Sequence, residues 1–126
     1  MKRRLIAAGG CFGLLSVATG AFGAHLLRDV LEPAQLSTWE TASRYAAVHA
    51  VMLVVLGTQG AALAPAHRKA GWLFALGILF FSGSLWGLAL TGWRFLGPVT
   101  PLGGLSLMSG WVLVVVGALR APAAAS

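Results

Sequence analysis

Four long apolar segments dominate this sequence and leave little chain for anything else. They cover about residues 5–27, 45–64, 70–93 and 102–119. A helix needs roughly 20 mostly apolar residues to cross a bilayer, and each segment reaches or approaches that length. Because 58% of the residues are hydrophobic and 10% are charged, the composition lies outside the range of soluble domains. The sequence therefore predicts a single transmembrane domain over residues 1–126.

The fold class that follows is all-α, an integral membrane four-helix bundle. The one polar connection of any size covers residues 28–44 and joins the first two spans. Pro33 suits the first turn of a helix, and Trp39 suits a membrane–water interface. Glu40 and Arg44 are four residues apart, the spacing of an exposed ion pair on a helix. We therefore expect a short interfacial helix between spans 1 and 2.

Small residues recur at helical spacing in the first span. They are Gly9, Gly13, Ser16, Gly20 and Gly23. Helices in a bilayer pack by close approach through small residues, so this stripe indicates a contact face. The second span carries larger and partly polar residues at the same spacing, namely Tyr45, His49, Met52, Leu56 and Gln59. Because polar atoms are costly in hydrocarbon, we expect this second stripe to face the glycine-lined helices.

The basic residues are distributed unequally between the two sides of the membrane. The amino terminus, the second connection and the tail carry six of them: Lys2, Arg3, Arg4, Arg68, Lys69 and Arg120. The opposite side has three, together with all the acidic residues. The excess predicts a multi-pass membrane protein with both termini in the cytoplasm. The net charge of +6 comes from span ends and not from one basic face, so we expect no nucleic-acid partner.

Two histidines are the main candidates for a functional site. With the second span beginning at Tyr45, His25 and His49 each lie about one turn below the outer surface, at a shared level. The candidate binding residues are His25, Arg44, Tyr45, His49, Ser84 and Thr100. Ionisable groups inside a membrane commonly serve a function, although they also serve as internal hydrogen-bonding partners.

Three interpretations of the histidine pair follow. The histidines are hydrogen-bonding partners for main-chain carbonyls, or titratable groups in a small cavity or proton path, or metal ligands. A metal site needs further ligands, and the sequence has no tight ligand pair, so we expect no metal and no cofactor. His67 beside two basic residues is interpreted as solvated. Ser82 lies near mid-membrane, away from both histidines, so we expect no catalytic residues and no enzyme.

Four motifs resemble a known family. They are GAFGAH at residues 20–25, TASRYAAVHA at 41–50, FSGSLWGLALTG at 81–92 and TPLGGLSLMSGW at 100–111. Together they resemble the small inner-membrane proteins of domain-of-unknown-function family 423. Ala46 stands where the family usually has glutamine, and Trp86 where it usually has tyrosine. The resemblance implies a four-span membrane protein without an established activity, whose motif residues gather in the outer half of the bundle.

These observations favour a non-enzymatic membrane protein. We expect a scaffold or accessory protein, or a binder of a lipid or other small hydrophobic ligand in an outward-facing pocket near His25 and His49. The alternative is an oligomeric channel or a proton-linked transporter for a small solute. The expected partners are the lipid bilayer, such a ligand, and another membrane protein or further copies of this chain.

Overall fold

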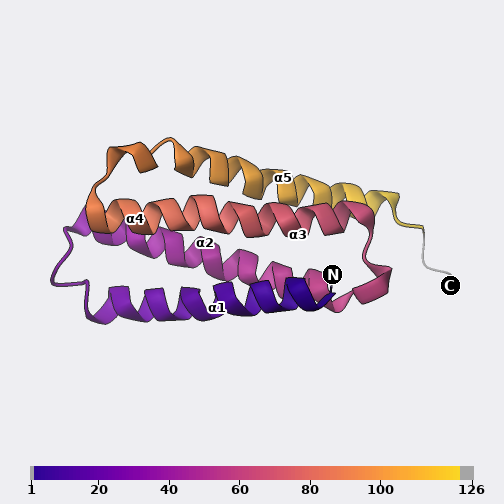
Figure 1. The fold of residues 1–126 in the computed structure, drawn as a ribbon, viewed down its shortest axis with the longest axis horizontal. Helices are drawn as coiled ribbons and strands as arrows, with labels where there is room; N and C mark the ends of the chain where they lie inside the picture. Colours follow the sequence, from indigo (N-terminus) through magenta and orange to yellow (C-terminus); the bar gives the residue numbers. More distant parts are fainter. Residues whose placement is uncertain (1, 123–126) are drawn as a thin grey trace.

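A computed structural model describes residues 2–122, and within this range the chain is entirely helical apart from short connections. Four helices are long and apolar enough to cross a membrane, which confirms the predicted all-α bundle of four long helices (Figure 1). The third of them contains a π-helical turn, and the fourth begins with a 3-10 turn. The elements are α1 (Lys2–His25), α2 (Pro33–Thr58), η1 (Gly60–Ala62), α3 (Pro65–Gly77), the π-helical turn η2 (Ile78–Ser82), α4 (Gly83–Thr91), η3 (Arg94–Leu96) and α5 (Val99–Arg120).

The helices lie side by side in the order α1, α2, α3–α4 and α5 (Figure 1). Helix α1 packs chiefly against α2, whereas α5 packs against α3 and η2. Helix α2 also contacts α3 and α4, so α2 and α3–α4 form the centre and α1 and α5 the flanks. Because α1 begins where α5 ends, we call that end of the bundle the terminal end. The opposite end, which carries the connections at 26–32 and 92–98, is called the loop end.

Helix α2 differs from the sequence-based expectation at its start. Residues 33–44 form its first turns, and the predicted separate interfacial helix between spans 1 and 2 is wrong. The main-chain N–H of Glu32 donates to the Gln35 side chain at 3.0 Å as part of a capping box, with Pro33 in the first turn. No glycine or proline occurs between there and Gly57. Nothing in the chain therefore breaks the helix before it reaches the terminal end of the bundle.

Trp39, which is predicted to hold an interfacial helix, is instead buried between helices. Its side chain is 5% exposed, and its indole N–H donates to the Thr19 carbonyl of α1 at 2.7 Å. The ring occupies the space beside Gly23, where an added Cβ would lie 2.6 Å from it. Contact with α1 therefore holds the beginning of α2 against the bundle.

Glycines mediate the closest helix contacts, as the small-residue spacing predicts. A Cβ at Gly9 would lie 2.8 Å from the carbonyl oxygen of Ala50, and a Cβ at Gly110 would lie 2.6 Å from the Phe74 ring. Gly103 packs directly on the main chain of η2. Gly20 is the exception in the predicted stripe, because an added Cβ there would meet nothing within 4 Å.

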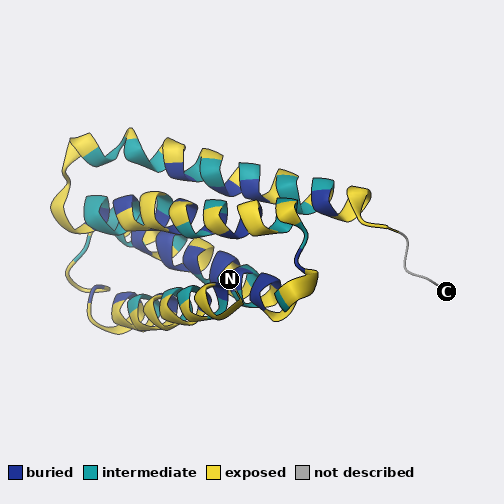
Figure 2. Cartoon of the chain, turned by 45° about the vertical axis from the view of Figure 1, so that its right-hand side comes forward, coloured by how far each residue is buried: buried dark blue, intermediate teal, exposed yellow. Residues whose placement is uncertain are grey.

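The interior is formed by residues from the two central helices and the inner face of α5. Phe74, Leu53, Leu56 and Ile78 are the largest fully buried apolar side chains. Ser82, also fully buried, donates from η2 to the Ala42 carbonyl of α2 at 2.7 Å. Buried residues follow the facing sides of the helices, while the outward sides are exposed and available to lipid (Figure 2). The polar contact of Ser82 therefore joins the two central helices within an apolar interior.

Candidate functional site

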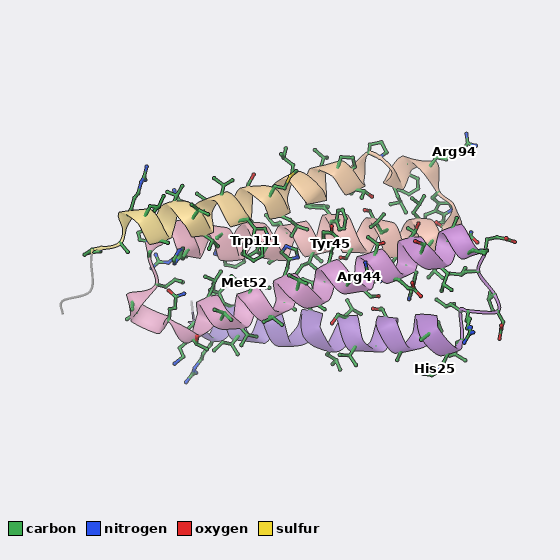
Figure 3. All side chains as sticks on the ribbon, turned by 180° about the vertical axis from the view of Figure 1, so that it is seen from behind. His25, Arg44, Tyr45, Met52, Arg94 and Trp111 are labelled. Atoms are coloured by element: carbon green, nitrogen blue, oxygen red, sulfur yellow. The ribbon has the colours of Figure 1, made fainter. Side chains whose placement is uncertain are left out.

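The structure does not bring His25 and His49 together. His25 is exposed at the loop end of α1 (Figure 3), and His49 is buried inside the bundle. Gly13 of α1 lies beside Ala50, so His49 is level with about residue 13, and His25 is about 18 Å farther along the helix axis. The predicted common level is wrong because α2 begins at Pro33 instead of Tyr45, which places His49 deeper.

His49 uses both ring nitrogens within the bundle. Nδ1 lies 2.7 Å from the carbonyl oxygen of Tyr45, and the indole N–H of Trp111 donates to Nε2 at 3.0 Å. An indole nitrogen only donates, so Nε2 is the acceptor and Nδ1 carries the proton. The ring is 4% exposed and packs against Phe74 and Trp111 at centroid distances of 5.3 and 5.8 Å. This geometry matches the interpretation of His49 as an internal hydrogen-bonding partner.

Tyr45 and Arg44 lie on the more open side of the same stretch of α2. Tyr45 is 43% exposed and packs on Phe81 of η2 with ring centroids 4.8 Å apart. Arg44 is exposed, and within residues 2–122 no carboxylate lies within ion-pair distance of it. The predicted Glu40–Arg44 ion pair is therefore absent from this structure.

Two adjoining cavities lie beside these residues, between α2 and α5. The first has a volume of about 280 Å³ and is lined by Tyr45, His49, Phe81, Gly104, Leu107, Met108 and Trp111. The second has a volume of about 360 Å³ and is lined by Arg44, Tyr45, Val48, His49 and Trp111. Their shared lining shows that they are parts of one depression, which we call the α2–α5 groove. Three of the lining residues, Arg44, Tyr45 and Trp111, are labelled in Figure 3.

Ser84 and Thr100 form a separate contact. Their hydroxyl oxygens are 2.6 Å apart, and Ser84 also donates to the Phe81 carbonyl at 2.9 Å. This pair joins α4 to the first turn of α5 and does not line the groove. The six candidate residues thus divide into an isolated His25, a packing pair, and a cluster of Arg44, Tyr45 and His49.

Trp111 is the principal groove residue that the candidate set lacks. It lies near the middle of α5, and tryptophan in membrane proteins is enriched at the interfaces instead. It is also the one aromatic residue after Phe95. An aromatic residue in mid-span is the sequence signal that could have singled out Trp111, although it does not identify His49 as the partner.

His67 is not the solvated residue that its basic neighbours suggest. Its Nε2 lies 3.0 Å from the Val114 carbonyl oxygen, and its ring packs against Gly117 of α5. Its Nδ1 is the one buried side-chain nitrogen or oxygen without a hydrogen-bond partner in the described part of the chain. His67 therefore holds α3 and α5 together near the terminal end.

Comparison with known proteins gives a consistent result across most of the chain. The family model described as "Protein of unknown function (DUF423)" matches residues 19–104. A UPF0382 membrane protein of Staphylococcus epidermidis is 43% identical over 112 residues, covering 89% of this chain and 92% of the relative. The UPF0382 inner membrane protein YgdD of Escherichia coli strain K12 is 39% identical over 114 residues, covering 86% and 83%.

No solved structure matches the chain. The family model includes the Arg44–His49 cluster and Gly104, and ends before Trp111. The fold, the four long apolar helices and the matches to named membrane proteins agree with one another. This chain belongs to the DUF423 (UPF0382) family of membrane proteins, whose function is unknown.

Proposed function

We propose that this protein is a non-enzymatic inner-membrane protein that binds a lipid or another small hydrophobic molecule in the α2–α5 groove. The observation that carries the proposal is a lateral depression with an aromatic and aliphatic lining and one charged side chain, Arg44. Small-molecule sites are typically concave and mostly apolar, with a few polar groups that fix orientation. The groove opens on the side of the bundle, where Tyr45 remains 43% exposed, so a ligand reaches it from the membrane.

The bonding of the buried hydroxyl groups supports a non-catalytic role. Ser82 donates to the Ala42 carbonyl, and Ser84 contacts Thr100 and the Phe81 carbonyl. A serine nucleophile needs a base within hydrogen-bonding distance. His49 is engaged by Tyr45 and Trp111, and no serine–histidine hydrogen bond occurs among residues 2–122.

The hydrogen bonds of His49 support a proton-linked path less well than they support ligand binding. Protonation of His49 would place a second N–H opposite the indole N–H of Trp111, and two donors repel. Loss of that hydrogen bond would weaken the contact between α2 and α5 at the groove. The binding proposal requires no such rearrangement.

For orientation, we propose that both termini lie in the cytoplasm. Six basic residues lie at the terminal end of the bundle. Lys2, Arg3 and Arg4 are in the first turn of α1, Arg68 and Lys69 are near the start of α3, and Arg120 ends α5. All three acidic residues belong to the loop end and the beginning of α2. Basic residues favour the cytoplasmic side, so the loop end faces outward. The part of the groove near Arg44 then lies in the outer leaflet.

The test fills the groove and counts retained lipid. Gly104 lines the groove, and an added Cβ there would approach Phe81 no closer than 3.6 Å, so Gly104→Leu places a side chain in the cavity without displacing the main chain. Gly10→Leu is the matched control, because Gly10 is exposed on α1 and a Cβ there meets nothing within 4 Å.

Native mass spectrometry of the purified full chain, released from phosphatidylcholine nanodiscs, would report the lipids that remain bound. We expect the wild-type protein and Gly10→Leu to retain one or more lipids and Gly104→Leu to lose them. Equal retention by all three proteins would overturn the binding proposal.

A further inference from the structure

We infer that the α2–α5 groove selects a phospholipid whose headgroup carries a net negative charge, and that Arg44 holds this headgroup through its phosphate. The inference rests on the proposed binding function of the groove and adds the chemical class of its ligand. Three features of the structure support it: the charge of Arg44, the depth of Arg44, and the composition of the groove.

Arg44 is an uncompensated positive charge inside a membrane-length helix. It lies eleven residues after Pro33, and from Tyr45 to Leu56 the helix has no other charged residue. Among residues 2–122 it has neither a carboxylate within ion-pair distance nor a side-chain hydrogen bond to a protein group. Charged residues within membrane helices are expensive and are usually paired or placed on a binding path. An anion from outside the protein would supply the missing partner.

The depth of Arg44 suits the junction between a headgroup and its acyl chains. Tyr45 packs on Phe81, and Gly103 packs on the main chain of the same residue, so Arg44 is level with about Leu102. That level is about 5 Å below the start of α5 at the loop end. Side chains of a helix lean toward its N-terminus, which for α2 is the loop end, and an extended Arg44 side chain would meet phosphate oxygens there.

From Arg44 the groove continues toward the terminal end along apolar residues. Val48 lies on the next turn of α2, with Leu107, Met108 and Trp111 on α5 opposite. An acyl chain attached to a headgroup at Arg44 would lie along these side chains. A phospholipid in the leaflet at the loop end has the same direction, with its headgroup toward the loop end and its acyl chains toward the terminal end.

Charge complementarity favours an anionic headgroup over a zwitterionic one. Arg44 is the one charged residue in the lining of either cavity, and the lining contains no acidic residue. A zwitterionic headgroup would bring an ammonium group to a site without a carboxylate. Glu40, one turn nearer the loop end, lies outside the lining. The guanidinium fork binds phosphate in two parallel hydrogen bonds, which either phospholipid offers, so the net charge of the headgroup decides the preference.

The test measures lipid enrichment from nanodiscs that contain equal amounts of phosphatidylglycerol and phosphatidylcholine with identical acyl chains. We expect native mass spectrometry to show phosphatidylglycerol enriched roughly tenfold on the wild-type protein, the scale of one charge-assisted contact. Arg44→Gln should reduce the ratio to near one, and Arg44→Lys should give an intermediate value. Arg94→Gln is the control, because Arg94 is exposed at the loop end, outside the groove lining (Figure 3).

Each outcome decides between the two proposals. If the wild-type protein retains both lipids equally, or if Arg44→Gln keeps the enrichment, the anionic preference is overturned while lipid binding in the groove stands. If Gly104→Leu retains as much of each lipid as the wild type, the groove itself is not the binding site. Thermal unfolding of each variant in detergent, followed by circular dichroism, verifies that the compared proteins are folded.

Discussion

Replacing Gly103 by alanine should destabilise the bundle, whereas the same replacement at the adjacent Gly104 should not. Both residues lie in the same turn of α5, so each change gains about the same helix propensity, up to about 1 kcal/mol. An added Cβ at Gly104 would have its nearest contact at 3.6 Å, in the Phe81 ring, which is ordinary van der Waals separation. At Gly103 it would overlap the main chain of Phe80 and Phe81 in η2.

The overlap at Gly103 cannot be relieved by a side-chain rotation, because the atoms concerned belong to the main chain. Overpacking of an interior costs about 1–3 kcal/mol and occasionally more. Since the propensity gain is common to both variants, it cancels in the comparison. The free energy of unfolding should therefore be lower for Gly103→Ala than for Gly104→Ala by about 1–3 kcal/mol, the cost of overpacking. Helix α5 would have to move away from η2, and Ser82 in η2 bonds to α2, so the disturbance would extend to the centre of the bundle.

Reversible unfolding in mixed micelles of increasing sodium dodecyl sulfate content, followed by circular dichroism, gives the free energies. Gly10→Ala provides a reference for propensity alone, because Gly10 has open space around it. The reasoning would be refuted if Gly103→Ala unfolded at the same denaturant content as Gly104→Ala. It would also fail if both variants lost stability equally relative to Gly10→Ala.

Three further predictions concern hydrogen bonds and orientation. Trp111→Phe removes the donor to His49 and should lower the free energy of unfolding by about 1 kcal/mol; a double-mutant cycle with His49→Leu should show coupling of similar size. Trp39→Phe leaves a main-chain carbonyl of α1 without its 2.7 Å donor and should cost about 1 kcal/mol in the same assay. In a background without the native cysteine, Arg28→Cys should react with an impermeant maleimide added to intact cells, and Arg68→Cys should react only after lysis; the reverse pattern would contradict the proposed orientation.

The four helices could be predicted because length and hydropathy determine them locally. The beginning of α2 could not, because polar residues after Pro33 are equally typical of an interfacial helix and of the first turns of a longer one. The contact of Trp39 with Gly23 and the Thr19 carbonyl distinguishes the two, and that contact is tertiary. A helix end misplaced by several residues moves every depth assigned along the helix, since each residue adds about 1.5 Å.

The candidate site shows the same division between local and tertiary information. His49 was identifiable because a polar residue in an apolar run requires a partner, and the structure supplies two. The association of His49 with His25 depended on the assumed start of α2, so it failed. Trp111 was missed because its partner comes from a helix 62 residues away in the sequence, and a sequence pattern within one span does not reveal such pairing.

Arg44 differs from the polar side chains inside the bundle, because each of those has a hydrogen-bond partner in the protein. Trp39 donates to a carbonyl of α1, Ser82 to a carbonyl of α2, and Ser106 to the Leu73 carbonyl at 2.7 Å. Each of these contacts joins two helices and removes a polar group from the lipid environment, where it would be costly. Arg44 has the largest requirement for such a contact and makes none within residues 2–122. A structural role would have given Arg44 a partner in the protein, so its isolation at the edge of the α2–α5 groove favours a partner drawn from the membrane.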